Sequence, residues 1–336
     1  RDYAVTGVQT CALPISYTTA RNVTLIGAGT IDGVQGTEAS IAGGFDNITV
    51  ITGANGTAGL LNNLTGPNTT NTWNVTGSNA GNLNGALNFS NFQILTGGSG
   101  ADTFNLSAGV NGSINGGGGT DTANIVSSFT APAAVLAINN VGTINDNTAA
   151  TITAATLDIS GATSIGSAGN PLLANIGALQ ISGSNGDAFI DTPGSVDLQG
   201  IALGSGIFTL VSGGSVTDST SQNVTAGTVS ITAVSGIGTS GAQINTVTGN
   251  LNAAVSGTGD IYASNTGAIT LGTISTANGA IDITSSGALI ANGPITTGGN
   301  GAITLATGSG DLTTTGTIVR SEERRVGKEC RSGWWP

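Results

Sequence analysis

The sequence contains no histidine and no methionine, and only 7% of its 336 residues are charged. An average soluble protein has about 25% charged residues. Histidine is the commonest general acid or base and a frequent ligand of catalytic metals. Its absence, together with a total of only seven lysines and arginines, excludes most acid–base, nucleophilic and metal-hydrolase chemistry. We therefore expect no enzyme activity.

Basic charge and long hydrophobic runs are also scarce. The formal net charge is −11, whereas nucleic-acid binding requires clusters of Lys and Arg that neutralise phosphates. The same imbalance argues against binding to an anionic membrane surface. No apolar run approaches the roughly 18 residues of a membrane-spanning helix. We expect no nucleic-acid partner and no membrane insertion, whereas an acidic chain can still bind cations.

Residues 1–16 and 320–336 differ from the rest of the chain. They hold both cysteines, Cys11 and Cys330, and six of the seven basic residues. The strings VTGVQTCALPI and RSEERRVGKECRSGWWP resemble translated sequencing adapters. This resemblance implies that both tails are adapter-derived and that residues 17–319 are an internal fragment of a larger protein. It also implies that the two cysteines are not a disulfide or redox pair.

Short runs in which apolar and polar residues alternate recur between turns rich in Gly, Asn and Ser. Examples are AITL, AIDIT, TVSIT, TLDIS and GIFTL. This alternation is typical of strands buried on one face. Helical periodicity is missing, and Gly, Asn, Thr and Ser are poor helix formers.

Two nested repeats organise these runs. Residues 150–218 match residues 222–291 at an offset of 72 that slips to 73, with apolar residues paired with apolar residues and Gly with Gly. Within this unit, residues 259–278, 279–300 and 301–318 align with one another. The sequence therefore predicts an all-β fold, a parallel β-solenoid of roughly 20-residue coils stacked about 4.8 Å apart. We expect about 14 such coils in residues 17–319.

An array of antiparallel β-sandwiches is the competing architecture. It would require longer strands and more aromatic residues than this chain has. Composition also divides the chain into an irregular segment rich in Asn, Thr and Gly, residues 17–145, and a segment with the 72–73-residue repeat, residues 146–319.

The segments GGSGADTFN (97–105) and GGGGTDTAN (116–124) fit the nonapeptide G-G-x-G-x-D-x-U-x. They resemble the turns of RTX proteins, which bind Ca²⁺ through backbone carbonyls and the Asp carboxylate. Two nonapeptides span 18 residues, and the spacing here is 19, so the two aspartates should nearly stack. The candidate calcium ligands and turn residues are Gly97, Gly98, Gly100, Asp102, Gly116, Gly117, Gly119 and Asp121.

Two alternatives limit what such patterns imply. Any solenoid corner needs glycine, so the nonapeptides also fit turns that hold no ion. Threonine pairs such as Thr151 and Thr153 resemble ice-binding faces, but the sequence does not sustain them on consecutive coils, so we expect no such face.

Three longer segments resemble bacterial β-strand-repeat surface proteins, which are similar to filamentous haemagglutinin-type adhesins. They are IGSAGNPLLANIGALQISGSNGDAFI (165–190), GGSVTDST (213–220) and GAITLGTISTANGAIDIT (267–284). The resemblance extends over nearly all of residues 17–319. It implies export, an extracellular location at the bacterial cell surface, and a host or neighbouring-cell surface or matrix glycans as partners.

The sequence leaves three functions open. The first is a structural and adhesive β-solenoid stalk of a large secreted surface protein. The second is a calcium-binding surface-layer or biofilm-matrix component, with Ca²⁺ as the only expected cofactor. The third is a polysaccharide-acting β-helix enzyme, for which Asp187 and Asp191 are the nearest acidic pair. Four residues apart on a strand, they would lie about 13 Å apart, farther than a typical glycosidase pair.

Overall fold

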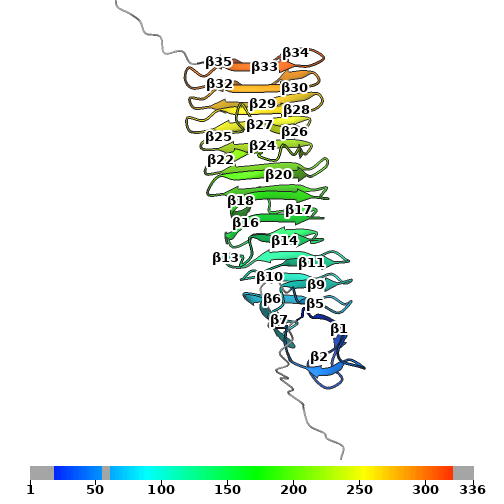
Figure 1. The fold of residues 1–336 in the computed structure, drawn as a ribbon. Coiled ribbons are helices and arrows are strands. Elements are labelled where there is room, and N and C mark those ends of the chain that lie inside the picture. Colours follow the sequence, from blue (N-terminus) through cyan, green and yellow to red (C-terminus); the bar gives the residue numbers. More distant parts are fainter. Residues whose placement is uncertain (1–18, 55–60, 321–336) are drawn as a thin grey trace, which may run out of the picture.

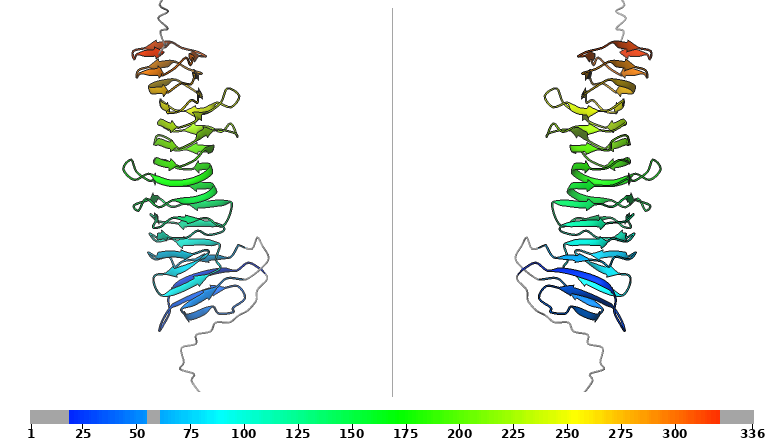
Figure 2. Two further views of the ribbon diagram at one scale, coloured as in Figure 1. Left: turned by 90° about the vertical axis from the view of Figure 1, so that its left-hand side faces the viewer. Right: turned by 90° about the vertical axis from the view of Figure 1, so that its right-hand side faces the viewer.

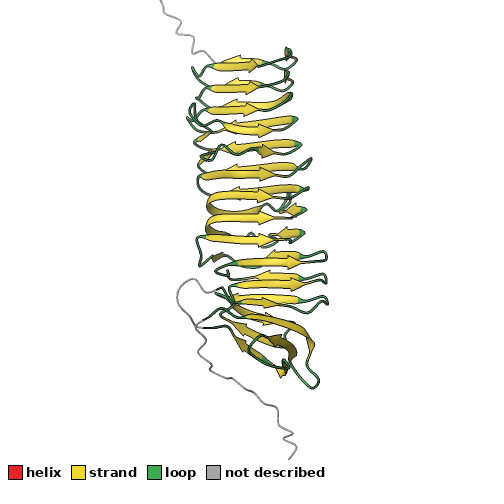
Figure 3. Ribbon diagram, turned by 45° about the vertical axis from the view of Figure 1, so that its right-hand side comes forward, coloured by secondary structure: helices red, strands yellow, loops and turns green. Residues whose placement is uncertain are grey.

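The computed structural model describes residues 19–54 and 61–320, which form 35 strands and no helix. The strands stack into an elongated rod (Figure 3). Near one end lie β1 (Asn22–Ala28) and β2 (Val34–Glu38), and at the other lie β33 (Ile303–Thr307), β34 (Leu312–Thr314) and β35 (Ile318–Arg320) (Figure 1). All long-range pairings beyond the first 90 residues are parallel. The predicted all-β parallel β-solenoid is confirmed, and the antiparallel sandwich array is wrong.

Two sheets form the faces of the rod. Sheet A consists of β1 (Asn22–Ala28), β2 (Val34–Glu38), β3 (Phe45–Ile48), β5 (Asn63–Thr65), β9 (Ile94–Gly98), β11 (Ser113–Gly117), β13 (Phe129–Thr130), β14 (Val135–Asn139), β16 (Ile152–Ser160), β18 (Leu172–Ser182), β20 (Val196–Ala202), β22 (Ser215–Thr217), β23 (Val224–Thr225), β25 (Gly236–Ile237), β26 (Ile244–Val247), β28 (Ile261–Asn265), β30 (Ile281–Ser285) and β33 (Ile303–Thr307). Sheet B consists of β4 (Val50–Thr52), β6 (Thr72–Gly77), β7 (Ala80–Leu83), β8 (Leu87–Ser90), β10 (Thr103–Leu106), β12 (Thr122–Ile125), β15 (Thr143–Asn145), β17 (Ser164–Ile165), β19 (Asp187–Thr192), β21 (Ile207–Ser212), β24 (Thr228–Ala233), β27 (Asn250–Val255), β29 (Ile269–Thr276), β31 (Leu289–Ala291), β32 (Ile295–Thr297), β34 (Leu312–Thr314) and β35 (Ile318–Arg320).

Each coil lies in register on the one before it. Ile114 of β11, for example, lies between Leu95 of β9 and Ile138 of β14, 19 residues before it and 24 after it. The solenoid has about 11 turns of about 21 residues, fewer than the expected 14. The N-terminal region accounts for the difference, because β1, β2 and β3 form one antiparallel sheet and β6, β7 and β8 another. These hairpins widen the N-terminal end of the rod (Figure 2).

The predicted segment boundaries fall on continuous structure or outside the described residues. The parallel ladder crosses residue 145, since Ile144 of β15 pairs with Ile165 of β17. Residues 1–16 and 321–336 of the predicted tails lie outside the described residues. Arg320, the first residue of the predicted C-terminal tail, ends β35 and pairs with Thr297.

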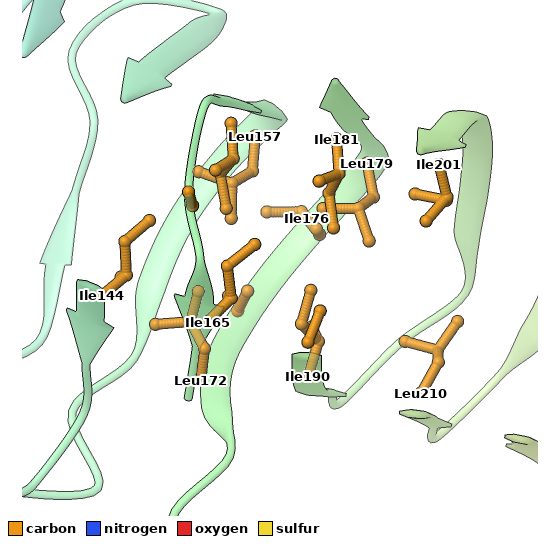
Figure 4. Close-up of a cluster of buried hydrophobic side chains, with 14 of the residues drawn as sticks. Ile144, Leu157, Ile165, Leu172, Ile176, Leu179, Ile181, Ile190, Ile201 and Leu210 are labelled. Atoms are coloured by element: carbon orange, nitrogen blue, oxygen red, sulfur yellow. The ribbon is translucent and has the colours of Figure 1, made fainter. Parts of the chain in front are cut away.

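The core is a set of apolar columns that run along the rod axis. Leu157, Leu179 and Leu198 occupy one column on three successive coils, and each is fully buried. Ile190 and Leu210 form another on the opposite sheet, and the two columns face each other across the interior (Figure 4). Burying one such side chain contributes about 1.5–3 kcal/mol. Because apolar and polar residues alternate, each coil buries further apolar side chains on both sheets, and each of them stabilises the fold.

Positions matched by the 72-residue repeat lie in opposite sheets. Leu179 belongs to β18 of sheet A, whereas its match Leu251 belongs to β27 of sheet B. Similarly, Leu210 of β21 in sheet B matches Ile283 of β30 in sheet A. One repeat unit therefore spans about three and a half coils.

Aromatic stacking strengthens the core where the hairpins join the ladder. The rings of Trp73 and Phe104 are stacked with centroids 5.7 Å apart and an interplanar angle of 10°, and both side chains are fully buried. We expect Phe104→Ala to lower the free energy of unfolding by about 3–5 kcal/mol, because it leaves a cavity that the surrounding core fills only partly. Urea unfolding followed by far-ultraviolet circular dichroism measures this loss.

The control is Phe189→Ala, because Phe189 is only half-buried on the outward face of β19. It should cost less than about 1 kcal/mol. Equal losses in the two variants would contradict the assignment of Phe104 to the core.

Candidate functional site

The two glycine-rich turns lie directly on top of each other. Each turn joins a strand of sheet A to a strand of sheet B, β9 to β10 in the first and β11 to β12 in the second. Gly98 pairs with Gly117, and Thr103 pairs with Thr122. The eight residues singled out in the sequence are therefore brought together at one corner of two adjacent coils.

The two aspartates bind the backbone and side chains of neighbouring coils. Asp102 Oδ1 accepts hydrogen bonds from the backbone N–H of Asn71 at 2.8 Å and from Asn71 Nδ2 at 2.7 Å. Asp121 Oδ1 in turn accepts a hydrogen bond from the backbone N–H of Asp102 at 2.8 Å. Both carboxylates are only 1% exposed. The column Asn71–Asp102–Asp121 thus ties three coils together at a buried corner.

The second oxygen of each carboxylate has no hydrogen-bond partner in the described part of the chain. These atoms are Asp102 Oδ2 and Asp121 Oδ2. A Cβ added at Gly97 would lie 2.3 Å from Asp102 Oδ2, and one added at Gly116 would lie 2.4 Å from Asp121 Oδ2. A side chain at the first position of each nonapeptide would clash with the carboxylate of the same coil. Glycine is therefore needed there whether or not an ion binds.

The other glycines of the motif are required by backbone geometry. Gly98, Gly117 and Gly119 have φ angles of +126°, +90° and +103°, which L-residues rarely adopt. Gly100 has no room for a side chain, because a Cβ there would lie 2.4 Å from the backbone carbon of Thr69. Turn geometry alone accounts for these positions.

Burial dominates the electrostatics of the corner. It raises the pKa of Asp102 to about 6; the hydrogen bonds from Asn71 oppose this rise, and the neighbouring charge of Asp121 adds to it. Burial also raises the pKa of Asp121. Carboxylates that are costly to ionise are stabilised by a proton or by a nearby cation.

The donor types at this corner fit Ca²⁺, which binds six to eight carboxylate, carbonyl and water oxygens. The aspartates supply two unpartnered oxygens. The Gly116 carbonyl oxygen lies near Asp102 Oδ2, since each of these atoms is 2.3 Å from the position that a Cβ on Gly97 would occupy. Nowhere in residues 19–54 and 61–320, this corner included, does a group of three or more acidic, His or Cys side chains gather. The calcium site stays a prediction carried by Asp102 and Asp121.

The acidic pair considered for an enzyme lies on a single strand. Asp187 and Asp191 both belong to β19, and Asp187 Oδ1 accepts a hydrogen bond from the backbone N–H of Ile207 at 2.8 Å. This bond ties Asp187 to the next coil. The expectation that the chain is not an enzyme stays a prediction.

Sequence reasoning missed an array on the outward face of sheet B. The tripeptide Thr-x-Asn opens β10, β12, β15 and the hairpin strand β6. In these strands the asparagines form a continuous chain of amide hydrogen bonds. The signal was available, since TWN, TFN, TAN and TIN are all in the sequence, but it lies in the segment interpreted as irregular.

Comparison with known proteins adds no relative. No family model, curated protein or solved structure matches the chain. Residues 19–54 and 61–320 contain no helix that could span a membrane.

The raised pKa of Asp102 predicts a pH dependence of stability. An unfolded Asp titrates near 3.9, so between about pH 4 and pH 6 the folded chain holds a proton that the unfolded chain has lost. Asp102 therefore stabilises the fold at low pH, and this contribution is lost as the pH rises towards 6. We expect Asp102→Asn to gain stability relative to the wild type between pH 4 and pH 7, measured by urea unfolding at each pH.

Asp46→Asn is the control with the opposite sign. Hydrogen bonds from the Thr30 hydroxyl and backbone N–H hold the pKa of the exposed Asp46 carboxyl below its usual value. This variant should lose stability relative to the wild type at neutral pH, and the difference should vanish at low pH. Parallel profiles for Asp102→Asn and the wild type would contradict a protonation event at the buried corner.

Proposed function

We propose that this chain is part of the structural and adhesive stalk of a secreted bacterial surface protein. The observation that carries the proposal is the uninterrupted parallel ladder from β9 to β33 over one continuous core. In such a solenoid each coil contacts only its neighbours, so the rod can be lengthened without altering any existing coil. About 11 turns at about 4.8 Å per turn make a rod of roughly 50 Å.

The outward surface supports an adhesive role. Its strands present mainly Thr, Ser and Asn, half-buried between neighbouring coils. Groups of this kind make weak contacts that gain strength when they are repeated along a rod. On this proposal the rod is displayed outside the cell, and its partners are a host or neighbouring-cell surface or matrix glycans.

The gene context tests this proposal directly. Long-read sequencing of the source DNA should show a reading frame that continues through further 72-residue units and includes an export domain. We expect this outcome because the repeat already occurs twice within the chain. A frame that instead joins a catalytic domain rich in His and Arg would make the solenoid a scaffold for an enzyme and would overturn the stalk proposal.

A second candidate is a calcium-binding surface-layer or biofilm-matrix component. The specific observation in its favour is the pair of buried Oδ2 atoms of Asp102 and Asp121 that lack hydrogen-bond partners. A bound cation would satisfy both atoms and offset the cost of burying their charge. The chain would then need Ca²⁺ for the full stability of two adjacent coils.

Calorimetry distinguishes this candidate from a plain stalk. Titration of the full chain with millimolar CaCl₂ should give a saturable heat that is lost in the double variant Asp102→Asn/Asp121→Asn. The matched control, Asp187→Asn/Asp191→Asn, removes the same charge from β19 and should bind as the wild type does. Absence of any binding heat in the wild type would leave the stalk without a calcium role.

A further inference from the structure

Four strands of sheet B present the same tripeptide outward. The middle residues Trp73, Phe104, Ala123 and Ile144 are fully buried. The residues on either side of them therefore point away from the core. We call the outward set the T-x-N face; it comprises Thr72, Asn74, Thr103, Asn105, Thr122, Asn124, Thr143 and Asn145.

The strand register arranges the T-x-N face as two straight columns. Thr103 pairs with Thr72 and Thr122, and Thr122 pairs with Thr143. The asparagines pair in the same order two residues farther along each strand. Neighbours therefore lie about 4.8 Å apart along the rod and about 6.7 Å apart across it. The face is a regular lattice of hydroxyl and amide groups.

The asparagine column is held rigid by its own hydrogen bonds. Asn105 Nδ2 donates to Asn74 Oδ1 at 2.9 Å, and Asn124 Nδ2 donates to Asn105 Oδ1 at 3.0 Å. The chain continues from Asn145 Nδ2 to Asn124 Oδ1 at 3.2 Å, and from Asn74 Nδ2 to Asn82 Oδ1 at 3.0 Å. Each amide keeps a second N–H and a second lone pair for a ligand. Because the side chains are already ordered, binding costs them little further entropy.

The threonine column is free to bind. The hydroxyls of Thr103, Thr122 and Thr143 make no hydrogen bond to any residue within 19–54 or 61–320, and the three side chains are half-buried rather than covered. Each hydroxyl can donate one hydrogen bond and accept two. Each of these three coils thus offers a ligand one free hydroxyl beside one fixed amide.

The charge distribution favours an uncharged partner for the T-x-N face. The T-x-N face carries no charged side chain, and the chain as a whole has a net charge of −11. Anionic polymers would be repelled by this field, and a cationic partner would find no carboxylate on the face. A neutral polymer with regularly spaced hydroxyl groups satisfies both columns.

We propose that the T-x-N face binds an uncharged polysaccharide chain lying along the axis of the rod. The distance between coils is close to the length of one sugar residue in an extended chain, so successive sugars can meet successive Thr–Asn pairs. This proposal rests on the adhesive function proposed above and names the chemistry of its partner. The binding strength would come from several equivalent contacts, one from each coil.

Adsorption to insoluble polysaccharides tests the face. The full chain should adsorb to microcrystalline cellulose or to chitin, both neutral, and not to alginate, which is anionic. The variant Thr103→Val/Thr122→Val/Thr143→Val removes three hydroxyls while keeping side chains that favour strands. One hydrogen bond changes a binding affinity by up to about tenfold. Because the triple variant loses three hydroxyls, we expect it to bind at least about tenfold more weakly than the wild type.

The matched control is Thr209→Val/Thr232→Val/Thr270→Val. These threonines also lie on the outward face of sheet B, but in three different columns. This control should adsorb as the wild type does, with circular dichroism confirming that all three proteins are folded. As a second test, Asn105→Asp places a charge in the middle of the amide column and should also weaken adsorption.

Three results would overturn the proposal: no adsorption of the wild type to either neutral polysaccharide, preferential adsorption to alginate, or equal weakening by the control and the T-x-N variants. Each leaves the stalk function untouched, because that function is tested by the reading frame and not by adsorption. A reading frame that ends in a catalytic domain would overturn the stalk while leaving the adsorption result standing. The two failures are therefore distinguishable.

Discussion

The backbone hydrogen bonds between successive coils constrain every other feature of this molecule. They fix each residue directly above a partner about one coil earlier, as Ile114 is fixed between Leu95 and Ile138. In the core columns and on the T-x-N face, a side chain therefore meets its own chemical class on the neighbouring coil. Like charges would lie about 5 Å apart in such columns, whereas apolar groups pack and amides bond to one another. The low charge, the buried leucine columns and the asparagine chain on the T-x-N face share this one cause.

The aspartate corner shows what happens when a charged group enters such a column. Asp102 and Asp121 are neighbours on adjacent coils, and burial makes ionisation costly for both. The structure limits the cost by giving one oxygen of each carboxylate a donor from the preceding coil. For Asp102 that donor is the neutral Asn71, and for Asp121 it is the backbone N–H of Asp102. The other oxygen of each is left unpartnered. Burial therefore makes the corner sensitive to protonation.

The sequence predicted what depends on alternation and on a regular period, and it missed what depends on unequal spacing. Ile and Leu at every second position identified the strands, and equal spacing identified the coils. The N-terminal hairpins were missed although Asn84 and Gly85, with φ angles of +54° and +68°, mark the tight turn between β7 and β8. The T-x-N face was missed because its tripeptides are separated by 31, 19 and 21 residues, so a fixed period does not reveal it. The pKa of Asp102 lay beyond reach, because it depends on burial that only the folded coils create.

The half-coil left over in each 72-residue unit has a geometric consequence. Because Leu179 and its match Leu251 lie in opposite sheets, successive units are related by a screw operation that reverses the two faces. A side-chain pattern encoded once per unit would point alternately to one side of the rod and then to the other. A long chain of such units would be a ribbon with two equivalent faces, suited to bridging two opposed surfaces rather than coating one.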